Sequence, residues 1–175
     1  MGSAAEGLIA GRHAAPEANS AARLIALLLP SALLAGALGS QYLGGLHPCE
    51  MCYWQRWPHG AAIVLAAFAF TAHTSSGRSR MLTLLAALAI AVSGAIGVYH
   101  AGVELGIFEG ITTCTAMATG GTTEELLRQI TQAPIIRCDQ VQFSFLGISM
   151  AGWNAILSLG GAAVVLWLLA KARRA

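Results

Sequence analysis

MLTLLAALAIAVSGAIGVYHAGV, residues 81–103, contains no charged residue. A helix that crosses a membrane needs about 20 mostly apolar residues, so this stretch is long enough to span a bilayer. Three further windows without Asp, Glu, Lys or Arg are of comparable or greater length, at residues 24–49, 57–77 and 140–170. Because backbone polar groups in lipid must be hydrogen-bonded within the segment, each window predicts a helix. The sequence therefore predicts an all-α, polytopic membrane protein built as a four-transmembrane-helix bundle.

The composition excludes an ordinary soluble enzyme. Of the 175 residues, 56% are hydrophobic and only 10% are charged. In a typical soluble domain about 25% of the residues are charged. The formal net charge of +2 is too small to indicate nucleic-acid binding. We therefore expect a single membrane domain surrounded by a lipid bilayer, with no nucleic-acid partner.

The ends of the chain differ from the apolar centre. Residues 1–22 mix small, polar and charged side chains without an apolar block, which predicts a cytoplasmic N-terminal tail without fixed structure. A membrane domain is predicted at residues 23–170 and a basic cytoplasmic C-terminus at 171–175. Within that domain we predict helices at about 23–44, 53–74, 81–103 and 146–170, and outward loops at about 45–52 and 104–145.

The distribution of basic residues predicts the orientation in the membrane. Seven of the ten lie on one predicted side: Arg12, Arg23, Arg78, Arg80, Lys171, Arg173 and Arg174. Lys and Arg are enriched on the cytoplasmic side of membrane proteins. Both termini are therefore predicted to be cytoplasmic, and both outward loops are predicted to face the opposite compartment.

The second outward loop contains a helix signal of its own. Thr122 and Glu125 have the spacing of a capping box, and Leu126, Leu127 and Ile130 form an apolar stripe after it. A short amphipathic helix of this kind can lie along a membrane surface. An ordinary solvated loop helix is an equally good interpretation.

Small residues recur every four positions in two of the predicted helices. They are Gly36, Ser40 and Gly44 in the first helix and Ser93, Gly97 and Ala101 in the third. Such spacing lets membrane helices approach closely. The alternative is that Gly and Ala are simply abundant in this chain.

The four cysteines lie between the apolar windows, on the outward face. Cys49 and Cys52 form a Cys-x-x-Cys pair, a spacing that can close a small disulfide ring and can lower a thiol pKa. Arg56 lies four positions after Cys52, so on a helix it would share a face with it and favour the reactive thiolate. Cys114 and Cys138 belong to the second loop. Two pairs at membrane boundaries indicate a redox relay.

The cysteines and His100 also fit other interpretations. Four thiols could bind zinc, but the spacing is poor for a zinc site, so no metal is expected. Two inert disulfides in a non-catalytic membrane protein are a second alternative, because disulfides persist in an oxidising compartment. His100, at the end of the third window, could transfer protons or serve as an interfacial anchor.

Three segments of the chain resemble the DsbB family of bacterial disulfide-bond formation proteins. Pro48-Cys49-x-x-Cys52-x-x-x-Arg56 is similar to that family's first periplasmic loop. Tyr99-His100-x-Gly102-x-Glu104, before Cys114, resembles the approach to its second loop. The segment from Cys138 through Phe145-Leu146-Gly147 to Asn154 resembles the entry into its fourth helix.

The resemblance implies an enzyme of the bacterial inner membrane, a quinone-dependent protein-thiol oxidoreductase that sustains disulfide formation. A periplasmic, DsbA-like protein of thioredoxin fold would be reoxidised by a Cys114–Cys138 disulfide. A Cys49–Cys52 disulfide would restore that bond, and membrane quinone would accept the two electrons. Cys52 would face the quinone and Arg56 would hold it, while His100 could aid proton transfer or quinone binding. The resemblance leaves open whether the quinone is ubiquinone or menaquinone, and whether the chain is a general DsbB or a dedicated, DsbI-like sister.

Overall fold

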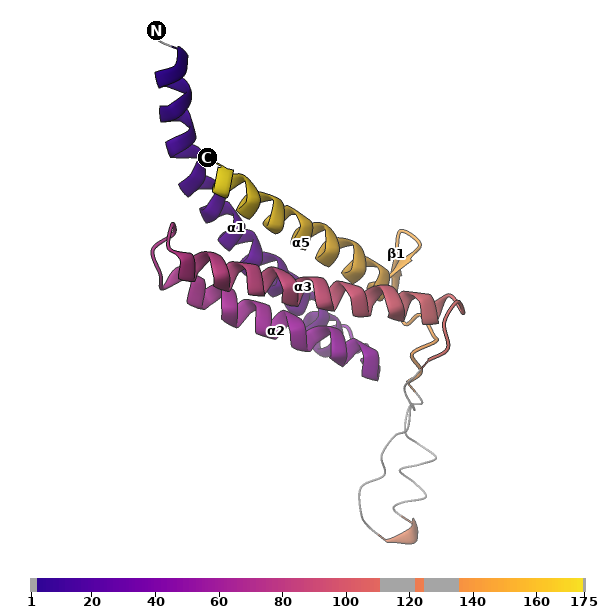
Figure 1. Ribbon diagram of the computed structural model, residues 1–175. Helices are drawn as coiled ribbons and strands as arrows, with labels where there is room; N and C mark the ends of the chain where they lie inside the picture. The colour runs from indigo at the N-terminus through magenta and orange to yellow at the C-terminus, as the bar shows by residue number, and fades with distance from the viewer. Residues whose placement is uncertain (1–2, 111–121, 125–135, 175) are drawn as a thin grey trace.

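A computed structural model describes residues 3–110, 122–124 and 136–174 (Figure 1). Its elements are the long helices α1 (Ser3–Tyr42), α2 (Glu50–Phe70), α3 (Gly77–Glu104) and α5 (Met150–Arg174), and the two-residue strands β1 (Ser144–Phe145) and β2 (Ile148–Ser149). The prediction of a helical architecture is confirmed. The short antiparallel hairpin of β1 and β2 was not predicted.

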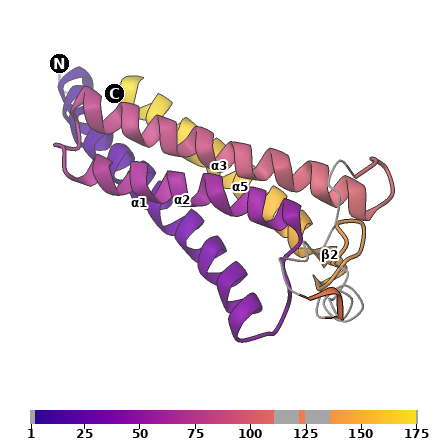
Figure 2. The same cartoon turned by 90° about the horizontal axis from the view of Figure 1, so that it is seen from below.

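The four helices form a bundle in which each helix packs mainly against two others. Helix α3 contacts both α2 and α5 along its length, and α1 contacts α5 and α2. Helices α2 and α3 lie side by side in both views (Figures 1 and 2). All cysteines that the structure describes lie at one end of this bundle, where α2 begins and α3 ends.

Three of these helices are long and apolar enough to cross a membrane. They are the Pro16–Tyr42 portion of α1, α3 and α5. Helix α2 is not among these three candidate spans of the described residues, and its 21 residues include Glu50, Arg56, Pro58 and His59. The fourth predicted membrane span therefore stays a prediction.

The N-terminal tail differs from the prediction. Helix α1 begins at Ser3, twenty positions before the predicted start at residue 23. Alanine has the highest helix propensity of all residues, and it recurs throughout the first 22 positions. The absence of an apolar block argued against a membrane segment there, but it did not argue against a helix.

The last helix is also displaced. Helix α5 begins at Met150, whereas the prediction placed its start at residue 146. Leu146 and Gly147 have φ values of 53° and 78°, which are left-handed conformations that a right-handed helix cannot contain. They form the turn of the hairpin, in which Phe145 pairs with Ile148. At its other end α5 continues to Arg174, so the predicted basic terminus is mostly the last helical turn.

Small side chains let the helices approach in the core. A Cβ atom built on Gly97 would lie 3.0 Å from the backbone nitrogen of Ala155, so α3 and α5 touch almost backbone to backbone there. A separate buried cluster of the bundle is largely alanine: Ala22, Ala26, Ala62, Ala66, Ala86, Ala87, Ile90, Ala162, Val165 and Leu169. The packing interpretation therefore holds at Gly97, whereas a Cβ on Gly36 would meet nothing within 4 Å.

Two predictions fall on parts of the chain outside the described residues. Cys114 belongs to the segment 111–121, and most of the predicted amphipathic helix belongs to the segment 125–135. The loop helix and the Cys114–Cys138 disulfide therefore stay predictions.

Candidate redox site

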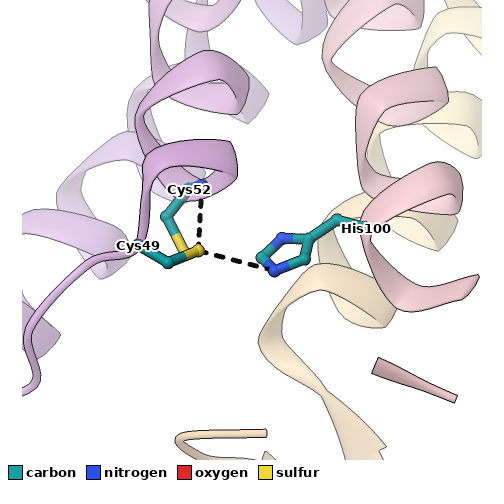
Figure 3. Close-up of side chains that lie close together, drawn as sticks. All are labelled: Cys49, Cys52 and His100. Carbon is teal, nitrogen blue, oxygen red and sulfur yellow. Dashed lines mark hydrogen bonds between the residues drawn. The ribbon is translucent and has the colours of Figure 1, made fainter. Parts of the chain in front are cut away.

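Cys49 and Cys52 meet at the N-terminal end of α2. Cys49 is the N-cap residue, and its sulfur accepts a hydrogen bond from the backbone N–H of Cys52 at 3.4 Å. One helical turn therefore brings the two Sγ atoms to 2.9 Å from each other (Figure 3). Both residues are thiols in this structure, with Cys49 buried and Cys52 half-buried. A disulfide between them needs only a small movement of either side chain.

The two thiols have different proton affinities. The hydrogen bond from the Cys49 thiol lowers the pKa of Cys52, and the positive charge of Arg56 lowers it further, although burial opposes both effects. The same hydrogen bond, together with burial, raises the pKa of Cys49. Both cysteines belong to the predicted outward loop that precedes the second predicted membrane span. The surroundings therefore favour ionisation of Cys52 over ionisation of Cys49.

Arg56 lies one helical turn after Cys52 on α2, and its side chain hydrogen-bonds to α1. Its Nη2 donates to the backbone oxygen of Ala37 at 3.1 Å, and its Nη1 donates to Oε1 of Gln41. Its Cζ lies 5.2 Å from the centre of the Tyr53 ring. These contacts hold the guanidinium in place while it lines a cavity beside the cysteines.

His100 projects from α3 toward the cysteine pair (Figure 3). Its Nε2 atom lies 3.5 Å from the sulfur of Cys49 and 3.9 Å from a carboxylate oxygen of Glu104. On the other side of the ring, Nδ1 lies 2.8 Å from Nε2 of Gln55. His100 as a residue is 3% exposed, so it is buried among its neighbours.

The described cysteine of the second loop lies beside the first pair. Cys138 is buried in one cluster with Cys49, Met51 and Val103. The backbone of Cys138 also interacts with the ring of His100. Three of the four predicted site cysteines are therefore brought together, and the fourth, Cys114, lies outside the described residues.

A cavity of about 580 Å³ opens beside the thiols. Leu33, Leu34 and Gly36 of α1 form one wall, and residues of α2, α5 and the segment before β1 form the others. Cys52 and Arg56 both line it. A volume of this order accommodates a small organic ring with part of a tail.

Sequence reasoning assigned no role to several polar residues of the site. Glu104 ends α3, and its carboxylate accepts a hydrogen bond from the hydroxyl of Ser149. Its position four residues after His100, on the same helix face, was the available signal. Gln55 and Asn154 hydrogen-bond at 2.7 Å. Asn154 ends a segment that resembles the family, whereas Gln55 carried no signal because buried amides have no characteristic spacing.

The ligand atoms of Cys49, Cys52 and His100 lie within 4.8 Å of one another. Three such atoms could in principle surround a metal ion. The side-chain amide of Gln55, however, faces Nδ1 of His100 with its nitrogen, which makes Nδ1 an acceptor and leaves the proton on Nε2. The ring nitrogen that faces the sulfurs is a hydrogen-bond donor in this arrangement, so the three residues do not present a ready metal site.

The fold and this site together define a class. Long apolar helices enclose a closely spaced dithiol, a fixed arginine and a cavity, which is the arrangement of an integral membrane protein with thiol-redox chemistry.

The comparisons with known proteins identify the family within that class. The model of the family "Disulfide bond formation protein DsbB" matches residues 5–168, and the chain belongs to this family. A relative named disulfide bond formation protein B from Azoarcus sp. (strain BH72) is 31% identical over 148 residues, covering 79% of this chain and 85% of its own. One of the same name from Methylococcus capsulatus is 30% identical over 155 residues, covering 82% and 91%.

A further relative comes from Rickettsia prowazekii, where it is called uncharacterized protein RP370. It is 24% identical over 139 residues, covering 78% of this chain and 79% of its own. No solved structure matches the chain. Membership of the family assigns this integral membrane protein to disulfide-bond formation.

Proposed function

We propose that this protein is a quinone-dependent thiol oxidase. It reoxidises a DsbA-like dithiol protein and passes two electrons through two cysteine pairs to membrane quinone. The observation that carries the proposal is the Cys49 and Cys52 pair beside a cavity that Arg56 also lines. A purely structural disulfide requires neither a cavity nor an arginine beside it.

The residues of the cavity fit a quinone. Its walls include leucines, which suit an apolar ring and tail, and Arg56 would hold a carbonyl oxygen of the ring. When bound, quinone supplies the acceptor for the two electrons and two protons that are released when the Cys49 and Cys52 thiols become a disulfide.

The residues of the chain have separate tasks in this proposal. Cys52, whose pKa is lowered, supplies the thiolate that faces the cavity. Cys114 and Cys138 exchange with the partner, and each exchange breaks one disulfide as it forms another, so electrons are conserved. The burial of Cys138 in one cluster with Cys49 supports direct exchange between the two pairs.

The proposal includes a location. The protein would lie in the bacterial inner membrane with both termini in the cytoplasm and both loops in the periplasm. Seven basic residues on one predicted side support this orientation. An oxidising periplasm would also allow the disulfides of the relay to persist.

A turnover measurement tests the function. Purified protein in detergent is given a soluble quinone and a reduced thioredoxin-fold protein, and hydroquinone formation is followed by absorbance. We expect turnover with the wild type and at least a 100-fold loss with Cys49→Ser, because one thiol cannot release two electrons as a disulfide. Cys114→Ser should lose turnover with the protein donor and keep it with a small dithiol.

The control separates catalysis from structure. Thermal unfolding of each variant is measured under reducing conditions, where a structural disulfide contributes nothing. Turnover at the wild-type rate in Cys49→Ser would reject the relay and favour two structural disulfides. Turnover with one periplasmic substrate only, and none with a general DsbA-like protein, would instead indicate a dedicated sister enzyme.

A further inference from the structure

A chain of buried polar side chains connects the cysteine pair to the middle of the bundle. It runs from His100 on α3 through Gln55 on α2 to Asn154 on α5, and Asn154 in turn contacts His59 and Ser158. Gln55, His59, His100 and Ser158 are each at most 6% exposed. Buried side chains of this kind have fixed donors and acceptors, because each unmade hydrogen bond is costly.

The orientation of Gln55 is fixed by a backbone carbonyl. Its Nε2 lies 3.1 Å from the carbonyl oxygen of Met51, which can only accept a hydrogen bond. The amide nitrogen of Gln55 therefore points toward Met51 and His100, and its oxygen points toward Asn154. The 2.7 Å bond from Nδ2 of Asn154 to Oε1 of Gln55 agrees with this orientation.

The orientation of Asn154 is fixed independently. Its Nδ2 lies 3.2 Å from the carbonyl oxygen of Ser93, a second group that can only accept. The oxygen of Asn154 then accepts from the hydroxyl of Ser158 at 2.9 Å. The backbone carbonyls of Met51 and Ser93, on two different helices, thus determine the orientation of the side-chain amides of Gln55 and Asn154.

This direction has a consequence for His100. Because Gln55 donates to Nδ1, that nitrogen carries no proton in the neutral ring, and the proton is on Nε2. Nε2 is the atom that lies 3.5 Å from the sulfur of Cys49. We propose that Gln55 is a positioning residue of the thiol oxidase, which holds His100 in the tautomer that donates a hydrogen bond to Cys49.

The inference rests on the proposed function, and it assigns a specific part of the chemistry. A donor at Nε2 stabilises Cys49 whenever its sulfur carries negative charge during exchange. Without Gln55 the ring could place its proton on Nδ1 and turn a lone pair toward the sulfur, which would disfavour the thiolate. Among the described residues, the charged or titratable groups near Cys49 include His47 before α2, Glu50, Cys52 and Arg56 on α2, His100 and Glu104 on α3, and Arg137 and Cys138 before the hairpin.

Nitrogen-15 NMR of the reduced protein tests the tautomer directly. Histidine is labelled in the full chain, and the His100 signals are assigned by their loss in His100→Asn. We expect a bare Nδ1 and a protonated Nε2 in the wild type. In Gln55→Glu the carboxylate can only accept, so Nδ1 should become protonated. A protonated Nδ1 in the wild type at neutral pH would overturn the proposal.

Alkylation of Cys49 tests the consequence. Rates are measured at pH 7 by peptide-resolved mass spectrometry in a Cys52→Ser background. Gln55→Leu should slow alkylation about tenfold, the usual effect of one hydrogen bond to a charged group. His100→Phe should slow it similarly, and the double variant should be no slower than either single variant, because Gln55 acts through His100.

Ser158→Ala is the matched control. It removes a buried hydrogen bond from the same chain but leaves both carbonyl contacts, so the rate should not change. Equal rates in Gln55→Leu and the wild type, or additive losses in the double variant, would overturn the positioning role. Neither measurement uses quinone or a partner protein. Failed quinone reduction alongside the expected tautomer would reject the proposed function and leave the assignment of Gln55 in place.

Discussion

Arg23 and Arg56 both connect α1 with α2, at opposite ends of the bundle, and their surroundings differ sharply. Arg23 is 7% exposed, its Nη1 donates to Thr74 at 2.8 Å, and its Cζ lies 4.3 Å from the centre of the Phe70 ring. Arg56 is half-buried and lines the cavity beside Cys52. The same residue type therefore closes the bundle at one end and borders an open site at the other.

The difference shows how a membrane protein can use a boundary arginine in two ways. A buried guanidinium that is packed on an aromatic ring stabilises the contact between two helices. A guanidinium beside a cavity is fixed by α1 on one side and can offer its remaining donors to a ligand on the other. Exposure and the neighbouring space distinguish the two roles, whereas charge and residue type do not.

The strongest test of this comparison removes each arginine in turn. Arg56→Ala should raise the apparent KM for quinone about 50-fold, because a charge-assisted hydrogen bond contributes up to about 2–3 kcal/mol. Arg23→Ala, the matched control, should leave the apparent KM unchanged. Steady-state quinone reduction with a fixed concentration of reduced partner provides the measurement. Equal KM values in the wild type and Arg56→Ala would reduce Arg56 to an interfacial anchor.

A milder substitution sharpens the role of shape. Arg56→Lys keeps the positive charge but loses the planar fork that can hold α1 and a carbonyl oxygen at once. We expect an apparent KM for quinone about tenfold above that of the wild type, and unchanged exchange between the Cys114–Cys138 pair and a protein donor. Exchange is measured by trapping the mixed disulfide. A silent lysine variant would show that only charge matters at this position.

The smallest expected effect concerns pH. The hydrogen bond with Cys49 is the main cause of the lowered pKa of Cys52, and the charge of Arg56 lowers this pKa further. Alkylation requires the thiolate, so removing Arg56 should shift the pH profile of Cys52 alkylation upward and slow the reaction at pH 7 about threefold. Rates are measured from about pH 5 to about pH 9, the range in which cysteine titrates. Cys49 is replaced by serine in this experiment. The profile of Arg23→Ala should overlay that of the wild type.

Much of the fold could be predicted because lipid imposes a strict rule on the sequence. The uncharged window 81–103 became α3 with ends within a few positions, since charged residues seldom lie in the middle of a membrane span. The start of α5 could not be predicted, because Leu146 adopts a left-handed conformation that leucine rarely takes. The local sequence does not indicate that Leu146 adopts this left-handed conformation.

The site was predictable only in part, for a related reason. Cys49, Cys52 and Arg56 lie on neighbouring turns, so their chemistry can be inferred from spacing alone. Gln55 and Asn154 are 99 positions apart and acquire their roles only when α2 packs beside α5. His100 was predicted as a candidate, but its contact with Cys49 depends on how α3 packs against α2.

The N-cap of α2 couples backbone order to the redox cycle. The sulfur of Cys49 accepts the N–H of Cys52 and so completes the first turn of the helix. Loss of an N-cap hydrogen bond costs about 1 kcal/mol, enough to let a terminal turn fray. In the proposed relay, that sulfur changes its covalent partner in every cycle, and the turn must tighten or loosen with it. The rate of amide hydrogen exchange at residues 50–52 would then depend on the oxidation state of the cysteine pair.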